Sequence, residues 1–100
     1  MNPITFSTLA CPGWSVREVI TRAAEFGYDG IEWRGGQQGH VQPGMPTLEK
    51  TALREMSKDE GIMALAVTAY TSFVYLNLEE RQSNTDELKR YADLAAELGA

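Results

Sequence analysis

The chain has 100 residues, with 9 basic against 14 acidic side chains and a formal net charge of −5. Its longest strongly apolar run, residues 62–67, is far below the ~20 residues of a membrane helix, so we expect no membrane partner. The first ten residues lack the basic and apolar stretches of a secretory signal, and a single cysteine, Cys11, cannot form an internal disulfide. We therefore expect a cytoplasmic protein, and the acidic balance argues against a nucleic-acid partner.

The first strand and helix are predicted near the N-terminus. Residues 4–9 are rich in β-branched and aromatic side chains, and the Cys-Pro-Gly sequence at 11–13 ends this predicted strand. Ser15 and Glu18 have the spacing of a capping box, which predicts that a helix begins after Ser15. One apolar face follows at helical spacing, and a glycine typical of a helix end closes it: Val16, Val19, Ile20, Ala23, Ala24 and then Gly27.

A second strand and helix follow at once. Residues 30–33 predict a short strand, and residues 35–46, with four Gly and two Pro, predict a loop. Thr47 is expected to cap a helix that runs to Glu60, with Gly61 as its end. The expected buried face of this helix comprises Leu48, Ala52, Leu53 and Met56.

The third strand is predicted over residues 62–69. This run is almost continuously apolar, which is typical of a parallel strand that is covered on both faces. A loop is expected over residues 70–82, with at most a helical turn near Leu78. The Ser-Asn-Thr-Asp sequence at 83–86 predicts the start of the last helix. Its expected buried face and end are Leu88, Tyr91, Ala92, Ala95, Leu98 and Gly99.

The glycines that end the helices fix the period of this pattern. Gly27, Gly61 and Gly99 are separated by 34 and 38 residues, and a repeated strand and helix at this spacing indicates α/β structure with parallel strands. Eight such units would need roughly 270 residues, close to the length of a (β/α)8 TIM barrel. The chain is therefore expected to be the truncated N-terminal part of a single TIM-barrel domain. Its three consecutive βα units span residues 3–27, 28–61 and 62–99.

Glu32 is the strongest candidate for a functional residue. In parallel sheets, ligands bind at the carboxyl ends of the strands, and Glu32 lies near the end of a predicted strand. If Ile31 and Trp33 face the helices, Glu32 faces the barrel interior. There its carboxylate could accept hydrogen bonds from sugar hydroxyls or assist a metal site. A structural ion pair, for example with Arg34, is the alternative interpretation.

The remaining candidates are aromatic or basic. Trp14, Trp33 and Tyr70 could form the walls of a sugar site, with core packing as the alternative. Arg34 could bind a phosphate or carboxylate, or be structural. His40, in the glycine-rich loop, could be a mobile substrate contact or proton carrier, and an exposed loop residue is the alternative.

Several catalytic signatures are missing from the sequence. No phosphate-binding P-loop and no dinucleotide-binding glycine motif is present. No set of His, Asp and Glu residues has the spacing of metal ligands, and nothing in the sequence would activate Cys11 as a nucleophile. The chain alone therefore shows no complete catalytic apparatus.

Residues 7–36 (STLACPGWSVREVITRAAEFGYDGIEWRGG) resemble the opening of the xylose isomerase-like TIM-barrel superfamily. Residues 64–73 (ALAVTAYTSF) and 95–100 (AAELGA) match later elements of the same pattern. The superfamily includes sugar phosphate isomerases and epimerases and the apurinic endonucleases. The resemblance implies a divalent metal (Mn, Mg, Zn or Co) held by Glu, Asp, His and Glu side chains from later strands, outside this chain.

The resemblance also implies roles for particular residues. Glu32 matches the acidic position of the second strand, which lines the substrate pocket, and Trp14, His40, Tyr70 and Thr71 match regions of the pocket wall. With Arg34, these residues form the predicted substrate-binding set, and no metal ligand is assigned. The expected parent protein is a metal-dependent sugar or sugar-phosphate isomerase or epimerase, either monomeric or a homo-oligomer.

Two other functions remain open. The second hypothesis is a non-catalytic fragment, or a partial barrel that must assemble with other chains, because three strands leave two open edges. An apurinic endonuclease is the third hypothesis. The acidic net charge and the absence of histidine at the end of the third strand, residues 68–71, weigh against it.

Overall fold

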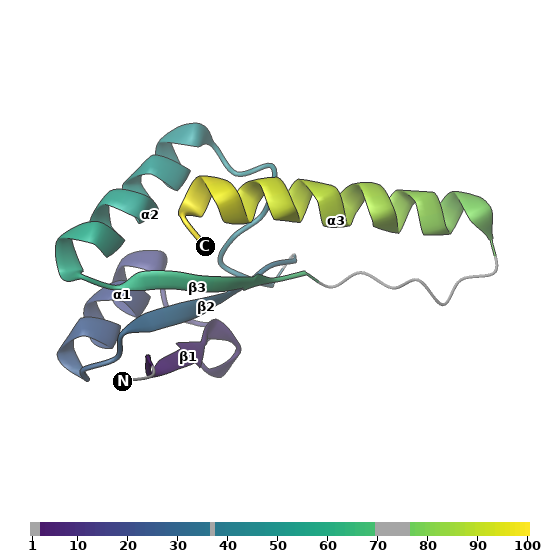
Figure 1. Cartoon of the computed structure of the whole chain (residues 1–100). Helices are drawn as coiled ribbons and strands as arrows, with labels where there is room; N and C mark the ends of the chain where they lie inside the picture. The colour runs from purple at the N-terminus through teal and green to yellow at the C-terminus, as the bar shows by residue number, and fades with distance from the viewer. Residues whose placement is uncertain (1–2, 37, 70–76) are drawn as a thin grey trace.

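The computed structural model describes residues 3–36, 38–69 and 77–100, and it contains three repeats of a strand followed by a helix (Figure 1). The elements in chain order are β1 (Thr5–Ser7), the 3₁₀ helix η1 (Thr8–Ala10), α1 (Val16–Glu25), β2 (Gly30–Arg34), α2 (Thr47–Glu60), β3 (Met63–Thr68) and α3 (Leu78–Leu98). The predicted α/β class is confirmed. The first strand is shorter than predicted, because the Ser7 hydroxyl accepts a hydrogen bond from the Leu9 amide and the chain turns into η1.

The three strands form one parallel sheet in the order β1-β2-β3. Ser7 of β1 pairs with Glu32 of β2, and Glu32 pairs in turn with Ala66 of β3. The register between β2 and β3 shifts by one residue at this point, since Ile31 pairs with Ala64. The parallel arrangement places the carboxyl ends of all three strands at one edge, as the TIM-barrel interpretation requires.

A hydrophobic core of described residues lies between the sheet and the helices. Figure 1 shows α2 and α3 above the strands. Ile31 and Trp33, from the central strand, are completely buried in it. The other buried apolar side chains come from the loops, from residue 62 and from the three helices: Cys11, Val19, Ile20, Ala23, Val41, Leu53, Ile62, Tyr91, Leu94 and Leu98. Most of the apolar burial therefore lies on the helix side of the sheet.

The start of α1 confirms the predicted capping box. The Ser15 hydroxyl accepts a hydrogen bond from the Glu18 amide at 3.1 Å, and the Glu18 carboxylate accepts one from the Ser15 amide at 3.4 Å. The predicted apolar face is also correct, with Val19, Ile20 and Ala23 buried. Local sequence alone determines this helix start, because both partners of the cap lie within four residues.

The predicted cap of α2 is wrong. Pro46 occupies the N-cap position, Thr47 is the first helical residue, and no side chain caps the amides. Leu48, predicted to be buried, is 84% exposed, whereas Leu53 is buried as predicted. Proline fixes an extended backbone just before the helix, and this ends the loop without a side-chain acceptor. Gly61 closes the helix in the left-handed conformation, as predicted.

The predicted start of α3 is also wrong, since the helix begins at Leu78. The Asn77 side chain accepts hydrogen bonds from the amides of Glu79 and Glu80, and these two carboxylates favour a helix N-terminus. Within the expected capping sequence, the Thr85 hydroxyl donates to the carbonyl of Arg81 instead. Leu88, predicted to be buried, is exposed, and Leu94 takes its place in the core.

β3 differs from the prediction of a strand covered on both faces. Ala64 and Val67 pack against the core, but Met63 is 46% exposed and Leu65 is 42% exposed. Within the described residues, no second layer covers the side of the sheet that faces away from the helices. We call this side of the sheet, with Ser7, Glu32, Arg34, Met63 and Leu65, the inner face.

Candidate functional site

The structure confirms the predicted orientation of Glu32. Its neighbours Ile31 and Trp33 are buried on the helix side, so the Glu32 side chain lies on the inner face, where it is half-buried. Strand pairing places Ser7 on one side of it and Ala66 on the other. The neighbours of Glu32 on the two adjacent strands are therefore a short polar residue and a small apolar one.

Arg34 shares the inner face with Glu32, two residues further along β2. Its backbone amide donates a hydrogen bond of 2.8 Å to the hydroxyl of Thr8, which is completely buried. Strand pairing places Arg34 beside Thr68 of β3. Glu32 and Arg34 therefore lie together at the carboxyl edge of the sheet. Thr8, which no sequence motif marks as a site residue, fixes the end of their strand.

The loop after β2 folds back onto the end of that strand. The amides of His40 and Val41 both donate to the carbonyl oxygen of Arg34, at 3.0 and 3.4 Å. Gly39 has no room for a side chain, because a Cβ there would collide with the carbonyl oxygens of Arg34 and Gly35. Gly39 therefore allows close backbone packing, which places His40 at the carboxyl end of β2.

His40 contacts two of the predicted aromatic candidates. Its Nε2 atom lies 2.5 Å from the carbonyl oxygen of Trp14, and its ring meets the Trp33 ring edge-on with centroids 6.1 Å apart. Trp33 is completely buried, so for this residue core packing is the correct interpretation. The Nε1 atom of Trp33 and the Nδ1 atom of His40 have no hydrogen-bond partner among the described residues.

The Trp14 side chain lies away from Glu32. It is 37% exposed and lines a hollow of about 290 Å³ beside β1 and α1, together with Phe6, Phe26 and Tyr28. Cys11 borders the same hollow, and burial raises the pKa of its thiol, which keeps it protonated and poorly nucleophilic. In the described residues, Trp14 is therefore joined to the candidate site through its backbone and His40 rather than through its indole.

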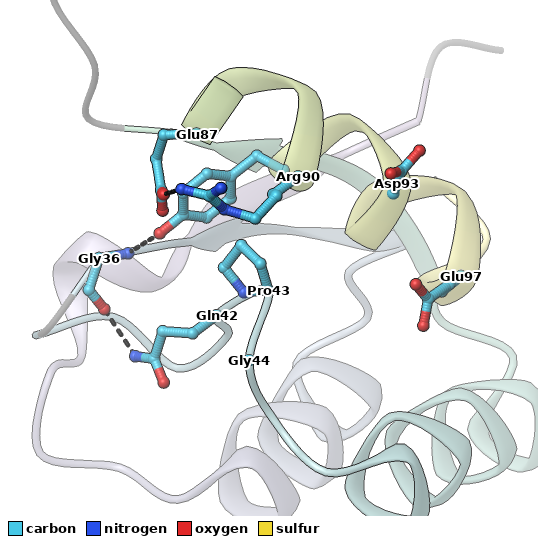
Figure 2. A pocket seen from close by; sticks show the side chains of 9 residues that line it. Gly36, Gln42, Pro43, Gly44, Glu87, Arg90, Asp93 and Glu97 are labelled. Atoms are coloured by element: carbon cyan, nitrogen blue, oxygen red, sulfur yellow. Dashed lines mark hydrogen bonds and ion pairs between the residues drawn. The ribbon is translucent and has the colours of Figure 1, made fainter. Parts of the chain in front are cut away.

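A second hollow, of about 510 Å³, lies between the loop after β2 and α3 (Figure 2). There the amide of Gly36 donates a hydrogen bond of 2.6 Å to the hydroxyl of Tyr91. The Tyr91 ring packs so closely on Gly35 that a Cβ at this position would overlap it. The sequence pattern predicts for Tyr91 only a place on a helix face. The adjacent glycines were the signal for a close approach of another element.

Two of the six predicted binding residues, Tyr70 and Thr71, lie outside the described residues. The four that are described form two pairs. Glu32 lies with Arg34 on the inner face, and His40, in the loop after β2, contacts Trp14, in the loop before α1. Among residues 3–36, 38–69 and 77–100, no three His, Cys, Asp or Glu side chains are placed to hold a metal ion. No described helix has the length and apolar composition needed to cross a bilayer.

Comparison with solved structures finds the same architecture. Over 97% of this chain, a D-psicose 3-epimerase solved in the presence of D-fructose superimposes with a TM-score of 0.80 at 17% identity. A xylose isomerase domain-containing protein from Salmonella typhimurium LT2 matches all of the chain, with a TM-score of 0.73 at 15% identity. The chain spans 34% and 36% of the lengths of these two proteins.

A longer protein contains the same unit. A fusion of a xylose isomerase-like TIM barrel with a 4-hydroxyphenylpyruvate dioxygenase matches 97% of the chain at 23% identity, with a TM-score of 0.72, and the chain spans 15% of its length. Comparison with curated proteins finds no match. The model of the family described as "Xylose isomerase-like TIM barrel" matches residues 20–100. The chain belongs to the xylose isomerase-like TIM barrel family.

Proposed function

We propose that this chain is the N-terminal part of a sugar or sugar-phosphate isomerase or epimerase, with its three βα units (3–27, 28–61 and 62–99) in one barrel domain. Family membership and the fold that it shares with a D-psicose 3-epimerase support this class of reaction. The proposed setting is a cytoplasmic protein whose partner is a small sugar rather than a nucleic acid or a membrane.

The observation that carries the proposal is the position of Glu32. A half-buried carboxylate on the inner face, near the carboxyl end of the central strand, lies where ligands of parallel α/β folds bind. A carboxylate accepts hydrogen bonds from adjacent hydroxyl groups, which is the chemistry that orients a sugar. In this proposal Glu32 orients a substrate hydroxyl, and Arg34 binds a phosphate or carboxylate group of the substrate.

The chain does not supply a metal site in its described residues, because no set of three ligands is present there. We assign the ligands of a divalent ion to segments outside this chain. When bound, such an ion would supply Lewis-acid polarisation of substrate oxygens. The contribution proposed for this chain is confined to binding and orienting the substrate.

Solvent deuterium uptake tests the proposal without knowledge of the substrate. The protein in its natural full length is incubated in D₂O with Mn²⁺, Mg²⁺, Zn²⁺ or Co²⁺ and a panel of free and phosphorylated ketoses and aldoses. An isomerase or epimerase that exchanges its abstracted proton with solvent incorporates deuterium next to the carbonyl, which mass spectrometry detects, and chromatography detects the converted sugar.

The alternatives predict different results. An apurinic endonuclease cleaves a duplex with an abasic site in the presence of Zn²⁺ or Mn²⁺ and leaves every sugar unchanged. A non-catalytic protein does neither. Either result, obtained with correctly folded and metal-loaded full-length protein, would contradict the proposal.

A further inference from the structure

His40 joins two loops that are far apart in the sequence. Its Nε2 atom lies 2.5 Å from the carbonyl oxygen of Trp14, which is 26 residues away, in the loop after β1. A carbonyl oxygen only accepts hydrogen bonds, so Nε2 must carry the proton. In the neutral ring, Nδ1 is then an acceptor, and it has no partner among the described residues. The one N–H of the neutral imidazole is therefore used by the backbone of Trp14.

The imidazole is attached to a closely packed part of the molecule. The amides of His40 and Val41 both donate to the carbonyl of Arg34, and the Val41 side chain is completely buried. Gly39 allows this close packing of the loop against the strand end. The edge of the Trp33 ring borders the imidazole. His40 is thus held at the end of β2 by backbone contacts that do not depend on Trp14.

The loop between β1 and α1 has few other hydrogen bonds. The Trp14 amide donates to the Cys11 carbonyl at 3.2 Å, and the Ser15 amide donates to Glu18. Both contacts lie within the same loop or the following helix. Further back, the Thr8 hydroxyl accepts the amide of Arg34. Between Thr8 and α1, the bond to His40 is the long-range hydrogen bond of this loop among the described residues.

We infer that His40 is a positioning residue, which holds the loop after β1 (residues 11–15) against the end of β2 through its Nε2–H. This assignment differs from a mobile substrate contact or a proton carrier, because the Nε2–H already donates to Trp14 and the other ring nitrogen, Nδ1, is buried. It rests on the proposed function in one respect: the loop belongs to the rim of a binding site if substrate binds at the carboxyl edge of the sheet.

The tautomer of His40 gives the first test. His40 is the only histidine of the chain, so ¹⁵N-labelled histidine in this chain yields a single pair of ring signals. At pH 8, long-range ¹H–¹⁵N spectra should show the tautomer with a protonated Nε2 and an unprotonated Nδ1. An average of the two tautomers in fast exchange would show a free imidazole and overturn the inference.

Hydrogen exchange in two His40 variants gives the second test. His40→Leu removes the donor and keeps a side chain of moderate size, whereas His40→Gln keeps an amide N–H that can reach Trp14. Loss of one hydrogen bond predicts that the Trp14 amide exchanges about tenfold faster in His40→Leu. In His40→Gln the rate should stay within about threefold of the parent. Gln38→Leu, an exposed substitution in the same loop, is the matched control.

Equal Trp14 exchange rates in His40→Leu and the parent would overturn the inference, and so would equal acceleration in the Leu and Gln variants. If His40→Leu fails to fold, the tautomer of the parent and the exchange rates of His40→Gln still test the inference. Neither measurement uses catalytic turnover. The inference can therefore fail while the proposed isomerase or epimerase activity is observed, and the reverse is also possible.

Discussion

The two faces of the sheet differ in almost every physical property. On the helix side, Ile31 and Trp33 are completely buried in a continuous apolar core. On the inner face, Glu32 is half-buried, and Met63 and Leu65 are 46% and 42% exposed. Both sets of residues come from strands whose side chains alternate. The helix side therefore supplies most of the stability of this unit, whereas the inner face carries the polar side chains of the candidate site.

Removal of the largest core side chain should cause the largest loss of stability. Trp33→Ala leaves a large cavity on the helix side and should lower the free energy of unfolding by about 3–5 kcal/mol. Glu32→Gln, on the opposite face of the same strand, should change it by less than about 0.5 kcal/mol. Urea denaturation of both variants measures the difference. Similar losses of unfolding free energy in the two variants would show that both faces contribute equally to stability.

A smaller effect is expected at the loop that follows β2. Gly39→Ala places a methyl group against the carbonyl oxygens of Arg34 and Gly35, and relief of this overlap should cost about 1–3 kcal/mol. Gly44→Ala is the matched control in the same loop, because nothing lies within 4 Å of a Cβ there. The Tm of each variant is compared with that of the parent. Equal Tm values for the two variants would contradict the packing described for Gly39.

The cap of α1 supports the covered face by a local interaction. Ser15→Ala removes the acceptor for the Glu18 amide and should lower the free energy of unfolding by about 1 kcal/mol. Ser83→Ala, at an exposed position within α3, should be neutral or slightly stabilising because alanine favours helices. Chemical denaturation measures both. A loss at Ser83 as large as that at Ser15 would show that the second capping sequence acts as a true cap.

The smallest effect is expected at the exposed inner face. Leu65→Asn in the 100-residue chain should change the free energy of unfolding by less than about 0.5 kcal/mol, because the side chain is 42% exposed. The same substitution should lower any concentration-dependent association, since it removes exposed apolar area. Denaturation and analytical ultracentrifugation measure the two effects. A loss above about 2 kcal/mol would mean that a partner covers this face in solution.

The parts of the fold that depend on neighbouring residues were predictable. The capping box at Ser15 and the left-handed glycines Gly61 and Gly99 appear where the sequence placed them. The start of α3 was not predictable in this way. Residues 83–86 have a composition typical of a cap, but Asn77 caps the helix earlier, and the hydroxyl of Thr85 bonds to the preceding turn.

The site was predictable to the extent that strand alternation determines it. Burial of Ile31 and Trp33 places Glu32 on the inner face, as the sequence pattern predicted. The contact between His40 and Trp14 was not predictable, because it joins residues 26 positions apart and depends on how two loops fold. The same holds for Tyr91, whose hydroxyl bonds to Gly36 from a helix 55 residues further along the chain.

The kcat/KM of Glu32→Gln tests the central claim most directly. It is measured in the full-length protein, on whichever sugar shows the fastest deuterium uptake, with Glu49→Gln on the exposed surface of α2 as the control. Loss of a charged acceptor for a substrate hydroxyl predicts a decrease of at least about tenfold, with no change in the control. An unchanged kcat/KM in a correctly folded Glu32→Gln variant would remove Glu32 from the site and contradict the account.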